Sequence, residues 1–354
     1  MESMEPNSPQ PASWFDRIPK VELHLHLEGA IPPATLWSLI QKYGGDPSVP
    51  TIESLRERFR YRDFAHFIDT WVWKNGFLRE YEDFERIASE VAADLARQGI
   101  RYVEAFYSPG DYRARGLEPG RLTAAIRRGL DRCPEIEVAL VADLIRDHGP
   151  ERAARMLDAV HEAREHGVIG VGIGGSEEAY PAQRFAPVFR RAREIGFRTS
   201  AHAGEAAGPE SVWDVIRSLE VDRIGHATRA IEDPDLLDHL AARHIPIEVC
   251  ISSNLRTGAV RSVAEHPVRT YFERGIPISI NTDDPRMFET SLAAEYKLLV
   301  DALGFRRADI EALVLQAAAS SWLPPACKDA LGQRLARELA AARRAGKRTL
   351  QERP

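Results

Sequence analysis

Eight short apolar runs, separated by helical stretches, constrain most strongly how this chain can fold. Each run is rich in β-branched and other apolar residues and ends near Gly, Pro or Asp, as strands do. Strands that alternate with helices indicate parallel βαβ units. Eight such units favour an α/β fold of the closed (β/α)8 type, a TIM barrel, over an open doubly wound sheet. The predicted strands are residues 21–27, 100–107, 137–144, 168–173, 198–202, 223–225, 245–251 and 276–281.

The longest interruption of this alternation, residues 31–98, lies between the first two predicted strands. It follows the carboxyl end of a strand, the side on which barrel enzymes build their active sites. We therefore predict a helical insertion over the pocket, acting either as a moving lid or as a stabilising cap. Its four predicted helices are 33–43, 52–60, 63–73 and 82–97, and helices 122–131, 152–166, 184–195, 210–219 and 234–243 are expected between later strands.

The 354 residues are divided by these patterns into three parts. Residues 1–14 are predicted to be a flexible tail, because they are polar and rich in proline. Residues 15–326 would form the barrel with its insertion. Residues 327–354 would form a C-terminal helix and tail, and the amphipathic, alanine-rich stretch 328–344 favours packing on the barrel over a membrane or partner role.

Composition excludes several classes of function. The formal charge of −6 gives no reason to expect nucleic-acid binding. No apolar run reaches the roughly 18 residues of a membrane span, and the first residues lack the features of a secretory signal. The three cysteines have no CxxC spacing, which disfavours a disulfide framework and is typical of a cytoplasmic protein. The oligomeric state is not predictable from these features.

Polar clusters follow four of the predicted strands. His24 and His26 fall on one face of the first strand, because side chains alternate along a strand. His202, His226 and Asp283 each stand at the end of a later strand. Imidazole nitrogens and carboxylate oxygens suit Zn²⁺, with Fe²⁺ or Mn²⁺ as alternatives. The other interpretation is that the histidines are hydrogen-bonded core residues and Asp283 forms a turn.

The segments HLHLEGA, SAHAGE, IGHAT and NTDDP, in this order, resemble the signature of the adenosine deaminase family of metal-dependent amidohydrolases. The resemblance extends from about residue 19 to residue 322. It implies one zinc ion held by His24, His26, His202 and Asp283, with Asp283 also counted in the catalytic set. It makes Glu205 the proton donor to purine N1 and His226 the partner of the attacking water. Asp284 would contact N7, the Gly175 amide N3, and Glu28 the ribose 5′-hydroxyl.

The residue chemistry agrees with this interpretation. Zinc lowers the pKa of a bound water from 15.7 to about 7. Attack on C6 of adenine moves electron density onto N1, where a buried and protonated Glu205 would supply a proton. Alternatively, Glu205 belongs to the start of a following helix. No lysine occurs in the Val171–Glu177 segment after the fourth strand, which favours one metal over the lysine-bridged pair of dinuclear amidohydrolases. Likewise, no PCxxC motif of cytidine-deaminase type is present.

The expected substrate is a purine nucleoside, adenosine or 2′-deoxyadenosine. Departures such as Gly225-His226-Ala-Thr and Ser176 leave other substrates open. Some bacterial members act on 6-aminodeoxyfutalosine in menaquinone synthesis, an adenine nucleoside with a benzoate at its 5′ end. For this substrate we name Arg62, Lys74 and Arg256 as candidate cations. Adenine deamination is a third possibility, and a non-catalytic metal-binding barrel is the remote one.

Overall fold

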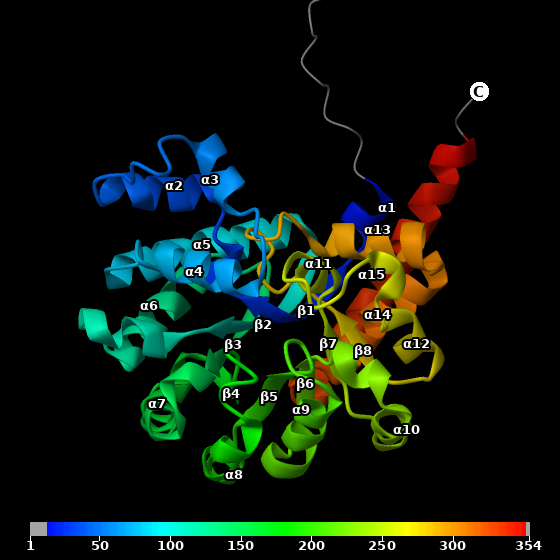
Figure 1. Cartoon of the computed structure of the whole chain (residues 1–354). Helices are drawn as coiled ribbons and strands as arrows, with labels where there is room; N and C mark the ends of the chain where they lie inside the picture. The colour runs from blue at the N-terminus through cyan, green and yellow to red at the C-terminus, as the bar shows by residue number, and fades with distance from the viewer. Residues whose placement is uncertain (1–12, 352–354) are drawn as a thin grey trace, which may run out of the picture.

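Eight parallel strands in sequential order form the centre of the molecule (Figure 1). The computed structural model describes residues 13–351, with side chains through residue 344. The ends of the sheet meet where the Asp283 carbonyl accepts a hydrogen bond from the His26 amide (2.8 Å) and the Asp283 amide donates to the His24 carbonyl (3.1 Å). The predicted (β/α)8 barrel is confirmed. Its strands are β1 Lys20–His26, β2 Ile100–Tyr107, β3 Glu137–Asp143, β4 Val168–Gly172, β5 Arg198–Ala203, β6 Arg223–His226, β7 Ile247–Val249 and β8 Ile278–Ile280.

Most helices surround the barrel, and the expected insertion segment contains four of them. The short helix α9 continues into one π-helical turn, residues 215–219. Described helices are α1 Trp14–Arg17, α2 Pro33–Lys42, α3 Ile52–Arg58, α4 Phe64–Asn75, α5 Tyr81–Arg97, α6 Pro119–Leu130, α7 Pro150–Glu162, α8 Ala186–Glu194, α9 Pro209–Asp214, α10 Pro234–Arg243, α11 Ile251–Arg256, α12 Val268–Glu273, α13 Leu292–Leu303, α14 Arg307–Ser320 and α15 Pro325–Gln351.

The first strand shows how the sequence pattern positions the site. Its leucines, Leu23 and Leu25, are fully buried and belong to the hydrophobic core. The alternate positions Glu22, His24 and His26 point to the other side, since His24 contacts residues of β5 and β7 across the barrel interior. A one-residue shift in register would exchange the two sets, so the apolar alternation fixes which side chains face the axis.

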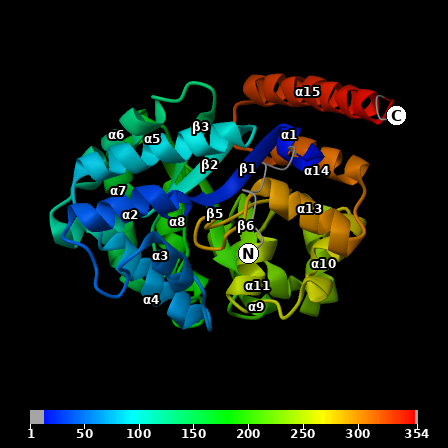
Figure 2. The ribbon, with the colours of Figure 1, turned by 90° about the horizontal axis from the view of Figure 1, so that it is seen from above.

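The two ends of the barrel are covered differently. Figure 2 shows α15 on one side of the molecule and helices α3 and α4 on the other. Helix α15 packs against α14, and its Glu338 pairs with Arg101 at 2.9 Å. Among the described helices, none is long and apolar enough to cross a membrane.

Helix α1 and its N-cap begin within the predicted tail, residues 1–14. Residues 1–12 of that tail lie outside the described residues. Ser13, however, caps α1 through its side chain, and Trp14 is 6% exposed. The tail prediction was therefore two residues too long, because it weighed the local polar composition and missed an indole that packs on distant residues.

Candidate metal centre and active site

Side chains from β1, β5 and the end of β8 converge at the carboxyl end of the barrel. The Nε2 atom of His202 lies 3.1 Å from Nε2 of His24 and 3.3 Å from Nε2 of His26. The Oδ1 atom of Asp283 lies 3.4 Å from Nε2 of His24 and 3.3 Å from Nε2 of His26. Ligands at the usual zinc distances, arranged as a tetrahedron, are separated by roughly 3.4 Å. These four separations match those between the ligands of a single tetrahedral ion.

Neighbouring groups orient these candidate ligands. The Nδ1 atom of His24 lies 2.7 Å from Oε2 of Glu248, so its N–H donates a hydrogen bond to this carboxylate and leaves Nε2 free as a ligand. The hydroxyl of Ser253 donates to Oδ2 of Asp283 at 2.7 Å. Burial would raise the pKa of Asp283, yet the neighbouring His24 and His26 side chains hold this pKa well below its ordinary value. Asp283 is thus present as the carboxylate that a metal requires.

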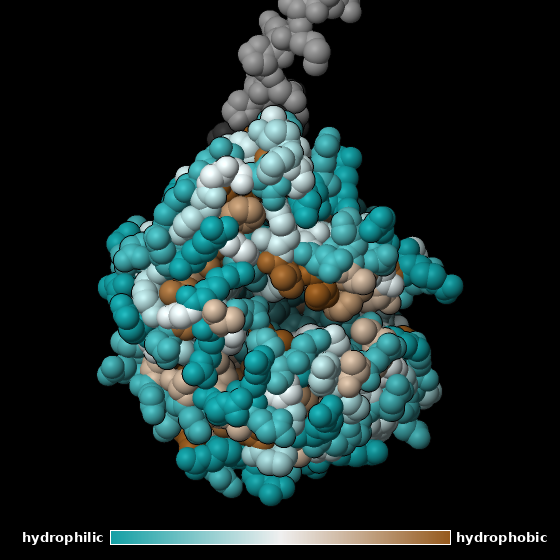
Figure 3. All heavy atoms as spheres, turned by 60° about the vertical axis from the view of Figure 1, so that its left-hand side comes forward, coloured by the Kyte–Doolittle hydropathy of each residue, from teal (hydrophilic) through white to brown (hydrophobic). Residues whose placement is uncertain are grey.

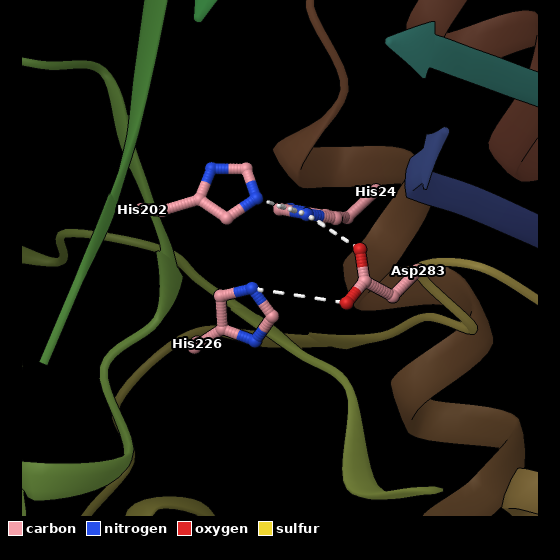
Figure 4. Close-up of side chains that lie close together, drawn as sticks. All are labelled: His24, His202, His226 and Asp283. Atoms are coloured by element: carbon pink, nitrogen blue, oxygen red, sulfur yellow. Dashed lines mark hydrogen bonds and ion pairs between the residues drawn. The ribbon is translucent and has the colours of Figure 1, made fainter. Parts of the chain in front are cut away.

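His226 also reaches this cluster, so two ligand sets are geometrically possible. Ligand atoms of His24, His202, His226 and Asp283 lie within 4.8 Å of one another, and Figure 4 shows these side chains turned toward one another. However, Nε2 of His226 is 4.0 Å from Oδ2 of Asp283 and 3.6 Å from Oε2 of Glu205. By comparison, Nε2 of His26 is only 3.3 Å from both His202 and Asp283, and His226 faces the cluster from the side of Glu205.

Glu205 is held beside the cluster by an acidic residue that we did not predict. The Glu177 carboxylate, itself 5% exposed, accepts hydrogen bonds from four consecutive backbone amides, those of residues 204–207, at 2.5–3.2 Å. Burial, with the negative charges of Asp283 and Glu177, raises the pKa of Glu205 well above its ordinary value. Glu177 follows the GIGG segment, but a sequence alone gives no sign that a carboxylate binds a loop 27 residues later.

A cavity of about 300 Å³ lies beside the cluster and is lined by His26, His202, Glu205 and Asp283 among others. The remaining predicted site residues differ in their relation to this cavity. Gly175 and Asp284 line it, whereas Glu28 does not. The Gly175 amide and Oδ1 of Asp284 have no hydrogen-bond partner among the described residues. Burial and the Asp283 charge raise the pKa of Asp284 to about 7. A Cβ atom at Gly29 would lie 1.7 Å from Asp284 Oδ1, so only glycine permits this packing.

Glu28 is buried behind the cavity wall. Its Oε1 atom accepts a hydrogen bond from the Ser108 amide at 3.0 Å, and Ser108 does line the cavity. Within the described residues its Oε2 has no partner. Burial raises the pKa of Glu28.

One wall of the cavity is apolar and comes from α4. It consists of Phe64, Phe67, Ile68, Trp71 and Val72. Figure 3, which brings the side of the insertion forward, shows hydrophobic residues beside a hollow in the surface. The insertion thus contributes directly to the cavity.

None of the three cations named from the sequence lines this cavity. Lys74 is buried, and its Nζ donates to the Glu28 carbonyl at 2.7 Å. Arg256 pairs with Glu289 at 3.5 Å. Arg62 is exposed.

A second cavity of about 440 Å³ adjoins the first, because Asp111 and His148 line both. Three exposed arginines border it: Arg113, Arg152 and Arg155. They form no ion pair or side-chain hydrogen bond in the part of the chain that the structure describes. The sequence analysis missed these arginines, because they stand outside every motif.

Comparisons with known proteins place this chain in a family and agree with the fold. A family model described as adenosine deaminase matches residues 19–338. An aminodeoxyfutalosine deaminase of Streptomyces coelicolor is 37% identical over 313 residues, covering 86% of this chain and 80% of its own. An adenosine deaminase of Salmonella typhimurium is 34% identical over 328 residues, which cover 90% of this chain and 98% of the Salmonella protein. A crystal structure of an amidohydrolase from Burkholderia ambifaria with bound Zn has a TM-score of 0.86 and 29% identity. The match covers 94% of this chain and 93% of the Burkholderia chain.

Proposed function

Because the chain belongs to the adenosine deaminase family of enzymes, we propose that it hydrolyses the 6-amino group of an adenine nucleoside. Adenosine or 2′-deoxyadenosine would yield inosine or 2′-deoxyinosine and ammonia. The observation that carries this proposal is the convergence of four ligand atoms beside two further groups, Glu205 and His226. These are the residue types needed for water activation and proton transfer.

We propose one zinc ion per chain, held by His24, His26, His202 and Asp283. The spacing of the four ligand atoms supports a tetrahedral ion, and the relative from Burkholderia ambifaria contains Zn. A bound zinc ion supplies Lewis acidity, which lowers the pKa of water to about 7.

The other site residues would bind and protonate the base. A protonated Glu205 would donate to purine N1 as the ring gains electron density. Asp284 would contact N7, since its Oδ1 lacks a partner and its carboxyl pKa is raised. The free amide of Gly175 would meet N3. Glu28 does not line the cavity in this structure, so its contact with the ribose 5′-hydroxyl would require the side chain to turn toward the cavity, where Oε2 would accept a hydrogen bond.

The first test measures ammonia release by the zinc-loaded protein from adenosine, 2′-deoxyadenosine and adenine at equal low concentration. We expect turnover of the nucleosides and much slower turnover of free adenine, which makes no ribose contacts. The proposal is wrong if the metal-replete protein leaves every adenine-containing compound unchanged.

A second candidate substrate is 6-aminodeoxyfutalosine, whose 5′ benzoate needs a cationic partner. The arginine-lined second cavity supplies free cations next to the first, and the Streptomyces coelicolor relative carries this activity in its name. If this is the substrate, Arg152→Gln should lower the ratio of kcat/KM for the benzoate-bearing nucleoside to that for adenosine by about tenfold. Arg190→Gln, which changes an exposed arginine of α8, is the matched control and should leave the ratio unchanged.

A further inference from the structure

His226 is the end of a chain of buried side chains that leads away from the metal centre. Its Nδ1 atom lies 3.0 Å from Nδ2 of Asn254. The Oδ1 atom of Asn254 lies 3.3 Å from Nε2 of His266. The Nδ1 atom of His266 in turn accepts a hydrogen bond from the backbone amide of Val268 at 3.2 Å. Asn254 is fully buried, and the two rings are 1% and 4% exposed.

The backbone amide at the start of this chain determines the direction of every bond in it. An amide can only donate, so Nδ1 of His266 is an acceptor and carries no proton. A neutral imidazole carries one proton, which must therefore be on Nε2 of His266, where it is donated to Asn254. The Asn254 side chain cannot be flipped, because its NH₂ group would then meet this N–H. Its NH₂ group accordingly donates to Nδ1 of His226.

We propose that His266 and Asn254 are positioning residues that hold His226 as the neutral tautomer protonated on Nε2. His226 then presents an N–H donor to the site. A nitrogen that carries a proton has no lone pair for a metal, so this assignment selects His26 over His226 as a ligand. Burial lowers the pKa of both His226 and His266 to about 3, which is consistent with neutral rings.

The Nε2 proton of His226 has no partner among the described residues, although Glu205 Oε2 is 3.6 Å away. A donor at this position holds an oxygen nucleophile by its lone pair and stabilises negative charge that develops on oxygen. His226 would thus orient and stabilise the attacking oxygen without accepting a proton, and the proton that reaches purine N1 would come from the carboxyl group of Glu205. This consequence for turnover rests on the proposed deaminase function, whereas the position of the proton does not.

The proton positions are measured by NMR of the zinc-loaded protein labelled with ¹⁵N in histidine. The nitrogen resonances distinguish a protonated from an unprotonated ring nitrogen, and a His226→Asn variant assigns the signals. We expect a proton on Nε2 of both His226 and His266 and none on either Nδ1. A proton on Nδ1 of His226 would overturn the proposal, even if the protein is an active deaminase.

Two substitutions at His266, a residue outside the cavity, test the consequence for catalysis. His266→Gln keeps an N–H that can donate to Asn254, whereas His266→Leu has a similar size and no donor. We expect kcat to fall by about tenfold in His266→Leu, with KM and zinc content nearly unchanged, and to stay near wild type in His266→Gln. Equal effects of the two substitutions would mean that His266 is only a packing residue.

Discussion

Two clusters of buried polar side chains occupy the barrel interior, and they differ in how completely their atoms are paired. The Arg223 cluster, formed by Glu104, Arg223 and Glu248, lies toward the end covered by α15. There Nε of Arg223 is 2.6 Å from Oε1 of Glu248, and Nη2 of Arg223 is 2.5 Å from Oε2 of Glu104. Arg223 also donates to the Ser320 carbonyl and stacks on Trp322.

The histidine cluster, formed by His24, His26, His202, His226 and Asp283, lies at the opposite end. The Nδ1 atoms of His26 and His202 and the Nε2 atom of His226 have no partner within the described residues. Buried polar atoms are normally satisfied, so unpaired ones indicate a ligand or a catalytic role. Glu248 joins the clusters, since one oxygen binds Arg223 and the other binds His24. The charges of the Arg223 cluster balance one another in ion pairs, whereas the histidine cluster keeps nitrogens without a partner, so we assign the first as support and propose the second as the site.

Metal removal should give the largest effect. Chelation is expected to reduce deaminase activity by at least about a thousandfold, because the histidine cluster then has no ion to activate water. Added Zn²⁺ should restore the activity. Metal content and ammonia release, measured on the same samples, provide the check, and full activity in metal-free protein would contradict the assigned role.

Glu205→Gln should lower kcat by about 10²- to 10⁴-fold, since an amide cannot supply the proton for N1. Zinc content and melting temperature should remain those of the wild type, because Glu205 is not among the proposed ligands. Steady-state kinetics with adenosine would measure the loss. An unchanged kcat would exclude Glu205 as the acid.

Arg223→Met should act on stability instead. It leaves two carboxylates buried without their cation, which costs about 3–5 kcal/mol of unfolding free energy. The matched control is Arg198→Met, which breaks an exposed pair with Asp222 and should cost at most about 1 kcal/mol. Urea unfolding of the three proteins measures both values. Similar costs would show that burial does not distinguish the two pairs.

Glu177→Gln should have the smallest effect, a fall in kcat of about tenfold with little change in KM. The amide keeps one acceptor oxygen but offers an N–H where backbone amides now donate, so the loop carrying Glu205 loses its fixed position. Glu178→Gln changes the neighbouring exposed carboxylate and should leave kcat and KM unchanged. If both variants match the wild type, Glu177 does not position the acid.

Strands and helices were largely predictable, because the hydrophobic pattern itself causes them. Strand β2 and helix α10 have the predicted bounds, and most other strands differ by one residue. The largest strand error is at β7, predicted as seven residues and observed as Ile247–Val249. There the apolar run continues into α11, because buried strand and helix residues have the same composition.

The candidate site was predictable where residues close a strand. His24, His26, His202, His226 and Asp283 follow apolar runs, and strands of a barrel bring their ends together. Glu28 shows the limit of this reasoning, since its place in the motif gave no indication that it is bonded to Ser108 and does not itself line the cavity. The backbone of His226 and Asp283 was equally unpredictable. Both have positive φ, an uncommon and strained conformation for such residues.

The sequence by itself determined the barrel, its family and the set of side chains at its carboxyl end. Alternating hydrophobicity and motif residues are local properties of the chain, and they can be recognised without coordinates. Only the tertiary structure decided which groups orient that set: Glu248 on His24, Glu177 on the Glu205 loop, and the amide of Val268, through His266 and Asn254, on His226. These contacts join residues far apart in the chain, and hydrogen bonds depend on distance and direction, which no local pattern encodes.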